Sequence, residues 1–268
     1  MRRIAVRRKS VSAAILLAAF ANSAAAPSQR VIESVLPALA YGASCSSTVR
    51  VQNLADTSVS IEVEAHRASG ALAALTGIAT RMIRLDPGQQ GEYRLDIDEE
   101  TTAAWVRLRE SVPESRPAPV VALSGATECR AGDQLRVVNR EVAFPTRNPW
   151  FSGDTAGLRG AQIALVNTSE HAARASACYS AGSLYSVPDA MQPMAELREL
   201  CSATLDAQIP PFGTREIPVE RNGNSHFSLR TRGDAIVLQM LRGGGDGVRI
   251  FSVDSTIQFG EEVTQPKH

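Results

Sequence analysis

The chain has 268 residues, 44% of them hydrophobic, with 28 basic and 28 acidic residues. Five of the basic residues and none of the acidic ones lie in the first 25 positions, so the remaining chain carries a net charge of −5. A mildly acidic protein is poorly suited to general nucleic-acid binding, and we expect no nucleic-acid partner. The roughly 240 residues after position 25 suffice for two domains of ordinary size.

A secretory leader is predicted at the N-terminus, in residues 1–25. A basic start is followed by an apolar core over Ala13–Ala21 and by small residues at Ser23–Ala25, which is the pattern of a cleavable signal peptide. The apolar core is short for a membrane span, although an uncleaved anchor is the alternative. No second apolar run of spanning length follows. We therefore expect an exported protein, periplasmic or extracellular, without stable membrane insertion after cleavage.

The rest of the chain has the pattern of β-strands. Apolar residues alternate with polar ones from Val59 to His66, which predicts a strand with one face in solvent. Similar runs occur at 93–97, 135–144 and 227–230. Turn signals separate them, as at Asp86-Pro87-Gly88. Short strands at this spacing predict an all-β protein built as an antiparallel sandwich.

Several segments occur twice in the same order, which predicts two tandem β modules over residues 26–146 and 147–268. The matched pairs are Thr48–Asn53 with Ala161–Asn167, Leu85–Gly88 with Ile209–Gly213, and Trp105–Arg109 with Ile236–Met240.

Four cysteines form an even number in an exported chain, which predicts two disulfides. The module boundary near residue 146 divides them two and two. We therefore predict that Cys45 pairs with Cys129 and that Cys178 pairs with Cys201. A zinc site is disfavoured because C-x2-C spacing and histidine partners are absent from the sequence.

The segment Pro188–Cys201 interrupts the β pattern and is predicted to be a short helical insertion in the second module. Met191, Met194 and Leu197 recur every three residues, as on one face of a helix. The insertion is either a lid over the core or a partner-binding surface that uses its methionines.

Two aromatic residues, Trp150 and Phe151, follow Asn148-Pro149 at the predicted module junction. They either plug the space between the modules or form a platform for a sugar ring. We include them among the possible partner-binding residues.

Motifs of known catalytic chemistry are absent from the sequence. The histidines fit no H-E-x-x-H frame, no G-x-S-x-G is present, and Gly243–Gly247 lacks the Lys and Ser/Thr of a phosphate loop. We therefore expect no catalytic residue, no metal, no cofactor and a non-enzymatic role.

The strands that end in asparagine (Arg50–Asn53 and Ala164–Asn167), the Leu85–Gly88 turn and the later apolar strand at Trp105 resemble the Ig-like β-sandwich repeats of bacterial cell-envelope proteins. The resemblance implies two tandem Ig-like domains. It also implies a binding, adhesive or structural role toward an unknown protein or glycan of the envelope.

The segment Arg81–Arg94 is also similar to part of the periplasmic pilus-assembly chaperones, which consist of two Ig-like domains behind a signal peptide. That resemblance implies a chaperone-like alternative. A secreted enzyme with a site between the modules is a third possibility. A strand-donating chaperone requires an exposed edge strand with alternating apolar residues, and an enzyme requires converging titratable groups.

Overall fold

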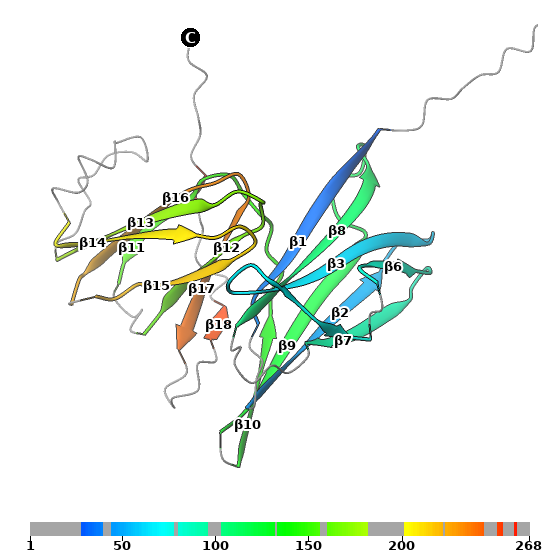
Figure 1. Ribbon diagram of the computed structural model, residues 1–268, viewed down its shortest axis with the longest axis horizontal. Helices are drawn as coiled ribbons and strands as arrows, with labels where there is room; N and C mark the ends of the chain where they lie inside the picture. The colour runs from blue at the N-terminus through cyan, green and yellow to red at the C-terminus, as the bar shows by residue number, and fades with distance from the viewer. Residues whose placement is uncertain are drawn as a thin grey trace, which may run out of the picture.

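The protein is described by a computed structural model that covers residues 28–39, 44–77, 80–95, 103–131, 133–155, 160–181, 201–221, 223–243, 251–253 and 260–261. Within these ranges the regular secondary structure consists of β-strands alone (Figure 1). All strand pairs are antiparallel. The prediction of an all-β protein is confirmed. The leader and residues 188–200 of the predicted helix lie outside the described residues.

The first half of the described chain forms two five-stranded sheets, which we call the N-terminal sheet pair. One sheet has the order β1-β8-β3-β4, with β6 also paired to β3; its strands are β1 (Gln29–Leu39), β3 (Val59–Arg67), β4 (Leu72–Ala73), β6 (Met82–Leu85) and β8 (Ala104–Pro113). The other has the order β10-β9-β2-β7-β5; its strands are β2 (Cys45–Asn53), β5 (Leu75–Thr76), β7 (Gln90–Leu95), β9 (Val121–Ala131) and β10 (Gln134–Arg140).

The second half forms a five-stranded and a four-stranded sheet, the C-terminal sheet pair. The larger has the order β14-β13-β16-β11-β19; its strands are β11 (Pro149–Asp154), β13 (Ala173–Ser180), β14 (Ala203–Ile209), β16 (His226–Arg232) and β19 (Gly260–Glu261). The smaller has the order β15-β12-β17-β18; its strands are β12 (Gln162–Asn167), β15 (Thr214–Pro218), β17 (Ile236–Gly243) and β18 (Phe251–Val253).

Each sheet pair encloses its own hydrophobic cluster, to which both of its sheets contribute. In β3, Ile61, Val63 and Ala65 are buried in the N-terminal cluster, as their alternation predicts. The opposite face of β3 was predicted to be in solvent, and for Glu64 and His66 this is wrong, because they are only 6% and 3% exposed. The C-terminal sheet pair covers that face, as described below.

The same order of strand pairing occurs in both sheet pairs. β2 pairs with β7 and β9 as β12 pairs with β15 and β17, and β8 pairs with β1 and β3 as β16 pairs with β11 and β13. The matched segments Thr48–Asn53 and Ala161–Asn167 therefore lie in corresponding strands. Trp105–Arg109 and Ile236–Met240 do not, because β8 corresponds to β16 and not to β17.

A buried asparagine ends β2 and another ends β12, and both hold a distant turn. The amide nitrogen of Asn53 donates to the carbonyl oxygens of Leu85 and Asp86, each at 3.1 Å. The amide of Asn167 donates to the carbonyl oxygen of Pro210 at 3.0 Å. These bonds explain why the two sequence motifs, a strand ending in asparagine and a Pro-containing turn, occur together: each motif satisfies polar groups of the other.

Candidate functional site

The two sheet pairs meet in a seam that buries both apolar and ionisable side chains. Its apolar part consists of Val35 and Trp105 from the N-terminal pair and Val166 and Val237 from the C-terminal pair, with Phe212 packed against them. Backbone bridges Val35↔Ala143 and Thr146↔Ile236 tie the intervening chain to each side. The seam therefore joins the two sheet pairs through direct packing as well as through the connecting segment.

Trp105 and Phe212 form the aromatic centre of the seam. The buried indole of Trp105 donates its Nε1–H to the carbonyl oxygen of Phe212 at 2.9 Å. His66 stacks on both rings, with centroid distances of 4.6 Å to Trp105 and 5.3 Å to Phe212. Gly70 completes the contact, because a side chain there would collide with the carbonyl oxygen of Pro211. Phe212 itself has a φ of 52°, so its turn is shaped for this contact at some conformational cost.

A buried ion network borders the aromatic centre. The carboxylate of Glu64 accepts hydrogen bonds from Nη2 of Arg107 and from Nη1 of Arg81, the latter at 2.8 Å. Arg107 also donates from Nη1 to the carbonyl oxygen of Thr168 in the C-terminal pair, at 3.2 Å. The pairing of β3 with β8 explains this cluster, since Glu64 lies opposite Arg107 and His66 lies opposite Trp105.

The charge states follow from burial and from these partners. Burial favours the neutral form of Glu64, but hydrogen bonding to Arg107 and the nearby positive charges outweigh it, and the pKa of Glu64 lies below its ordinary value. Burial lowers the pKa of His66 more than the Gly70 carbonyl and Glu64 raise it. At neutral pH the network is thus a carboxylate bound to two arginines beside a neutral imidazole. This arrangement suits a structural clamp, because Glu64 is already held by cations and is a weak base.

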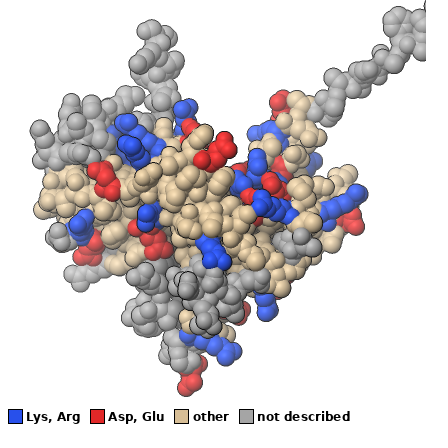
Figure 2. Space-filling view, viewed as in Figure 1, with Lys and Arg blue, Asp and Glu red and all other residues tan. Residues whose placement is uncertain are grey.

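The charged residues continue along the same face of the sheet, away from the seam. Arg109 contacts Glu62 at 3.3 Å and Glu33 at 3.8 Å, and Arg107 also lies 3.7 Å from Glu33. Figure 2 shows blue and red side chains interleaved in this part of the surface. The face is close to electrically balanced, so it provides pairing between strands and no strong field for a charged partner.

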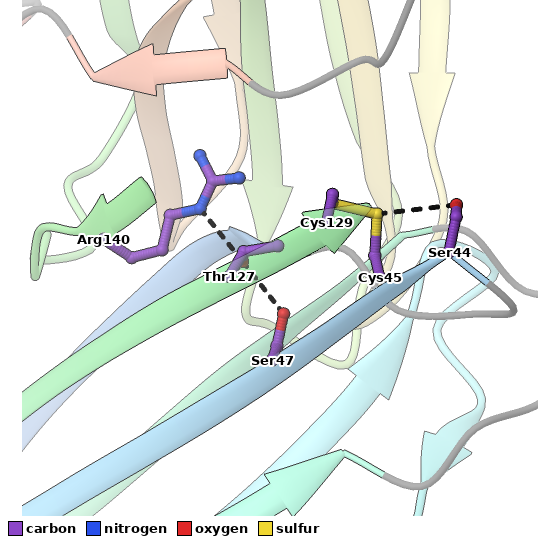
Figure 3. The surroundings of a disulfide bond; sticks show 6 residues. All are labelled: Ser44, Cys45, Ser47, Thr127, Cys129 and Arg140. Carbon is purple, nitrogen blue, oxygen red and sulfur yellow. Dashed lines mark hydrogen bonds between the residues drawn. A yellow bond between two sulfur atoms is a disulfide. The ribbon is translucent and has the colours of Figure 1, made fainter. Parts of the chain in front are cut away.

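Both predicted disulfides, Cys45–Cys129 and Cys178–Cys201, are confirmed. Cys45 and Cys129 lie directly opposite each other on β2 and β9, as Figure 3 shows. Two disulfides indicate an oxidising, exported environment. Among the described residues, no helix is long and apolar enough to cross a membrane.

A hydrogen-bonded chain beside the first disulfide links three strands (Figure 3). Arg140 of β10 donates from Nε to the hydroxyl of Thr127 at 3.4 Å, and Thr127 hydrogen-bonds to Ser47 of β2 at 2.9 Å. Burial lowers the pKa of Arg140 to about 10, so the guanidinium is still protonated at neutral pH. The base of β10 is therefore fastened to the sheet.

The structure describes two of the predicted partner-binding residues, Phe151 and Trp150. Phe151 is 5% exposed and packs against Phe227 in the C-terminal core, so its predicted roles in a sugar platform and in the seam are wrong. Trp150 precedes it in β11 and is half-buried. Met191, Met194 and Leu197 lie outside the described residues.

Sequence reasoning missed Trp105 and Phe212 as the aromatic residues of the seam. Trp105 was interpreted only as part of an apolar strand, and Phe212 only as part of a turn. For Phe212 the sequence did contain a signal: a large aromatic side chain in a Pro-Pro-Phe-Gly turn is costly to expose to water, which predicts a surface that covers it.

The β9–β10 hairpin is the most prominent exposed element, and its tip projects beyond the other strands in Figure 1. Leu135 and Val137 of β10 are 56% and 55% exposed. They are two residues apart and so lie on one face of the strand. This is the pattern that a strand-pairing surface requires.

No protein-family model, curated protein or solved structure matches the chain. The described residues also contain no group of three or more His, Cys, Asp or Glu side chains that could hold a metal ion.

Proposed function

We propose that this protein is an exported, non-enzymatic binding module of the cell envelope, built from two tandem Ig-like β-sandwich domains. It binds an extended segment of another envelope polypeptide along β10. The observation that carries this proposal is an edge strand with two exposed apolar side chains on one face, Leu135 and Val137.

β10 is the last strand of its sheet, and β18 of the C-terminal sheet pair lies close to it. In the described residues its ladder partner is β9, over the register Gln134↔Ala131 to Arg140↔Gly125. An edge strand of this length presents backbone N–H and C=O groups that can pair with another chain. An incoming strand would gain these hydrogen bonds and would cover Leu135 and Val137, so that side-chain pockets add specificity to backbone pairing.

The hairpin is fixed to the rest of its sheet at two places, beside its turn and at its base, which favours tight binding. β9 pairs with β2 from Asn53↔Val121 to Cys45↔Cys129, and the disulfide ends this ladder. Arg140 adds the link to Thr127. A strand that is already ordered loses little conformational entropy on binding.

Three further observations support the remaining parts of the proposal. The common order of strand pairing and the paired roles of Asn53 and Asn167 support two related domains. The neutralisation of Glu64 by Arg107 and Arg81 supports a structural seam over a catalytic one. The two disulfides support export, and periplasmic or extracellular location fits equally well.

The experiment uses the full chain and a dye-labelled peptide of alternating valine and threonine, followed by fluorescence anisotropy. Replacing Leu135 and Val137 by aspartate should abolish binding, because the incoming strand would lose apolar contacts and would bury unpaired carboxylates at a cost in desolvation free energy. The matched control replaces Leu72 and Met82, an equally exposed apolar pair of the other sheet, by aspartate and should bind normally. Equal binding by both double variants would refute the role of β10.

A periplasmic pilus-chaperone-like role is the second candidate, and β10 favours it because such chaperones act by strand addition. The two candidates differ in substrate. A chaperone suppresses aggregation of a subunit that lacks one strand of its sandwich, whereas a binding module recognises a partner that is already folded. Light scattering of such an incomplete subunit, with and without the protein, separates them.

A further inference from the structure

A slot opens between β3 and β8 at the end of these strands farthest from the seam. The two strands are paired from Arg67↔Ala104 to Ile61↔Glu110, and the recorded pairing stops there. Beyond that point they diverge around a cavity of about 320 Å³, which is at the small end of the range for ligand pockets. The slot shares no lining residue with the seam or with β10.

The walls of the slot are fixed because each diverging strand is still paired on its other side. Val59 and Ser60 of β3 pair with Leu85 and Arg84 of β6. The end of β8 pairs with the start of β1, through Ser111↔Val31 to Pro113↔Gln29. The slot is therefore part of the sheet framework and not a gap between loose loops.

The turn after β8 is also held in place. Arg30 donates from Nη2 to the carbonyl oxygen of Arg116 at 2.6 Å, and the Arg116 N–H donates to the Pro113 carbonyl at 2.9 Å. Beneath the turn, the buried carboxylate of Glu110 accepts the backbone N–H groups of Val120 and Val121. Arg116 is thus presented at the rim by an ordered backbone, and the Glu110 oxygens below accept backbone N–H groups while also being influenced by the positive charge of Arg116.

The lining combines hydroxyl groups, apolar surface and one cation. The hydroxyls come from Thr57, Ser58, Ser60 and Ser111, and the apolar part from Val59, Val112, Pro113 and Val120. Within the described part of the chain, the hydroxyls of Thr57, Ser60 and Ser111 make no hydrogen bond and the Arg116 guanidinium makes no ion pair within 4.0 Å; the Ser58 hydroxyl donates to Asp86. Arg116 is the one charged residue among the lining side chains.

We propose that this slot binds a single acidic sugar unit. Serine and threonine hydroxyls can donate to and accept from the hydroxyls of a sugar ring. The valine and proline surface can pack against the ring's C–H groups. The guanidinium at the rim can bind a carboxylate through two parallel N–H···O bonds, which a neutral sugar cannot offer.

The test is a titration of the isotopically labelled full chain with glucuronate and, separately, with glucose, followed by NMR. Glucuronate should shift the amides of Ser60, Ser111 and Arg116, and glucose should bind about tenfold more weakly. Arg116→Gln should reduce glucuronate binding to the level of glucose. Arg174→Gln, an exposed arginine of the other sheet pair, is the control and should change nothing.

A second variant probes the hydroxyl wall. Thr57 and Ser111 are exposed, so replacing both by alanine should preserve the fold, which thermal unfolding can check. The double variant should bind both glucuronate and glucose more weakly than the wild type does. The inference is overturned if glucuronate causes no shift at the slot, if glucose binds equally well, or if Arg116→Gln binds glucuronate as the wild type does. The double aspartate variant of β10 should retain glucuronate binding, so the two proposals can fail independently.

Discussion

The indole N–H of Trp105 and the carbonyl oxygen of Phe212 are joined by a hydrogen bond of 2.9 Å across 107 residues of sequence. This bond connects a strand of one sheet pair to a turn of the other, at a contact where the indole is buried. Because the indole of Trp105 is fully buried, losing the Phe212 carbonyl as acceptor would leave the indole N–H unsatisfied. The seam is therefore sensitive to single substitutions that leave each core untouched.

We predict that Trp105→Phe lowers the free energy of unfolding by about 2–3 kcal/mol, from the lost hydrogen bond and the lost ring volume. Trp150→Phe is the matched control, because no described residue accepts a hydrogen bond from the buried Nε1 of Trp150. Its cost should be about 1 kcal/mol or less. Urea unfolding followed by circular dichroism measures both. Equal losses would show that the Trp105 bond contributes nothing specific.

The ion network should make stability depend on pH. Glu64→Gln removes a buried carboxylate from two arginines and should cost about 3 kcal/mol at neutral pH. The control Glu92→Gln breaks an exposed pair with Arg50 and should cost below about 1 kcal/mol.

The direction of the pH effect follows from the lowered pKa of Glu64. The unfolded carboxyl, near its ordinary 4.5, binds a proton before the folded one does, so the stabilisation is complete above about pH 4.5 and is lost as pH falls through the folded pKa. The stability gap between wild type and Glu64→Gln should therefore narrow in acid. A gap that stays constant down to pH 3 would contradict the assigned charge state.

The two asparagines at the ends of β2 and β12 should be equally important in their own sheet pairs. Asn53→Ala leaves the carbonyls of Leu85 and Asp86 without their donor and should cost about 2–3 kcal/mol, and Asn167→Ala should cost a similar amount. Asn139→Ala, on the exposed side of β10, should stay within about 0.5 kcal/mol of wild type. Thermal unfolding of the three variants gives the comparison. An Asn53→Ala variant as stable as the wild type would show that the hydrogen bonds of Asn53 to the Leu85 and Asp86 carbonyls do not stabilise the fold.

The two disulfides should differ in their effect. They span 84 and 23 residues, for which the loop-entropy relation gives upper values of about 4.6 and 3.4 kcal/mol. Replacing Cys45 and Cys129 by alanine should therefore destabilise the protein more than replacing Cys178 and Cys201. Urea midpoints of the two double variants test the order; a reversed order would show that strain or residual unfolded structure dominates.

Sequence patterns predicted the features that depend on local chemistry. The alternation in Val59–Arg67 identified the core face of β3, and the even division of cysteines identified both disulfides. The burial of Glu64 and His66 could not be read in the same way, because it depends on partners far away in sequence: Arg107 for Glu64 and Phe212 for His66. The prediction for Phe151 failed for a related reason: nearness to the junction in sequence did not mean nearness to the seam in space.

The structural role of Asn53 and Asn167 also could not be predicted from their neighbours in the sequence. A strand that ends in Asn and a Pro-containing turn were recognised as separate motifs. Their hydrogen bonds, from Asn53 to Leu85 and from Asn167 to Pro210, span 32 and 43 residues. Only the folded arrangement joins each motif to its partner.

The pairing of β1 with β8 also sets the order in which an emerging chain can fold. β1 leaves the ribosome or export channel first, yet its ladder runs from Leu39↔Ala104 to Gln29↔Pro113. Until residues 104–113 have emerged, β1 lacks its complete partner strand, and its exposed backbone can pair with other chains. In the same way, β11 cannot form its ladder with β16 until β16 has emerged. Each sheet pair can therefore close only after its later strand has emerged, and a nascent chain arrested before Ala104 presents an unpaired β1 to any factor that protects unfolded polypeptides.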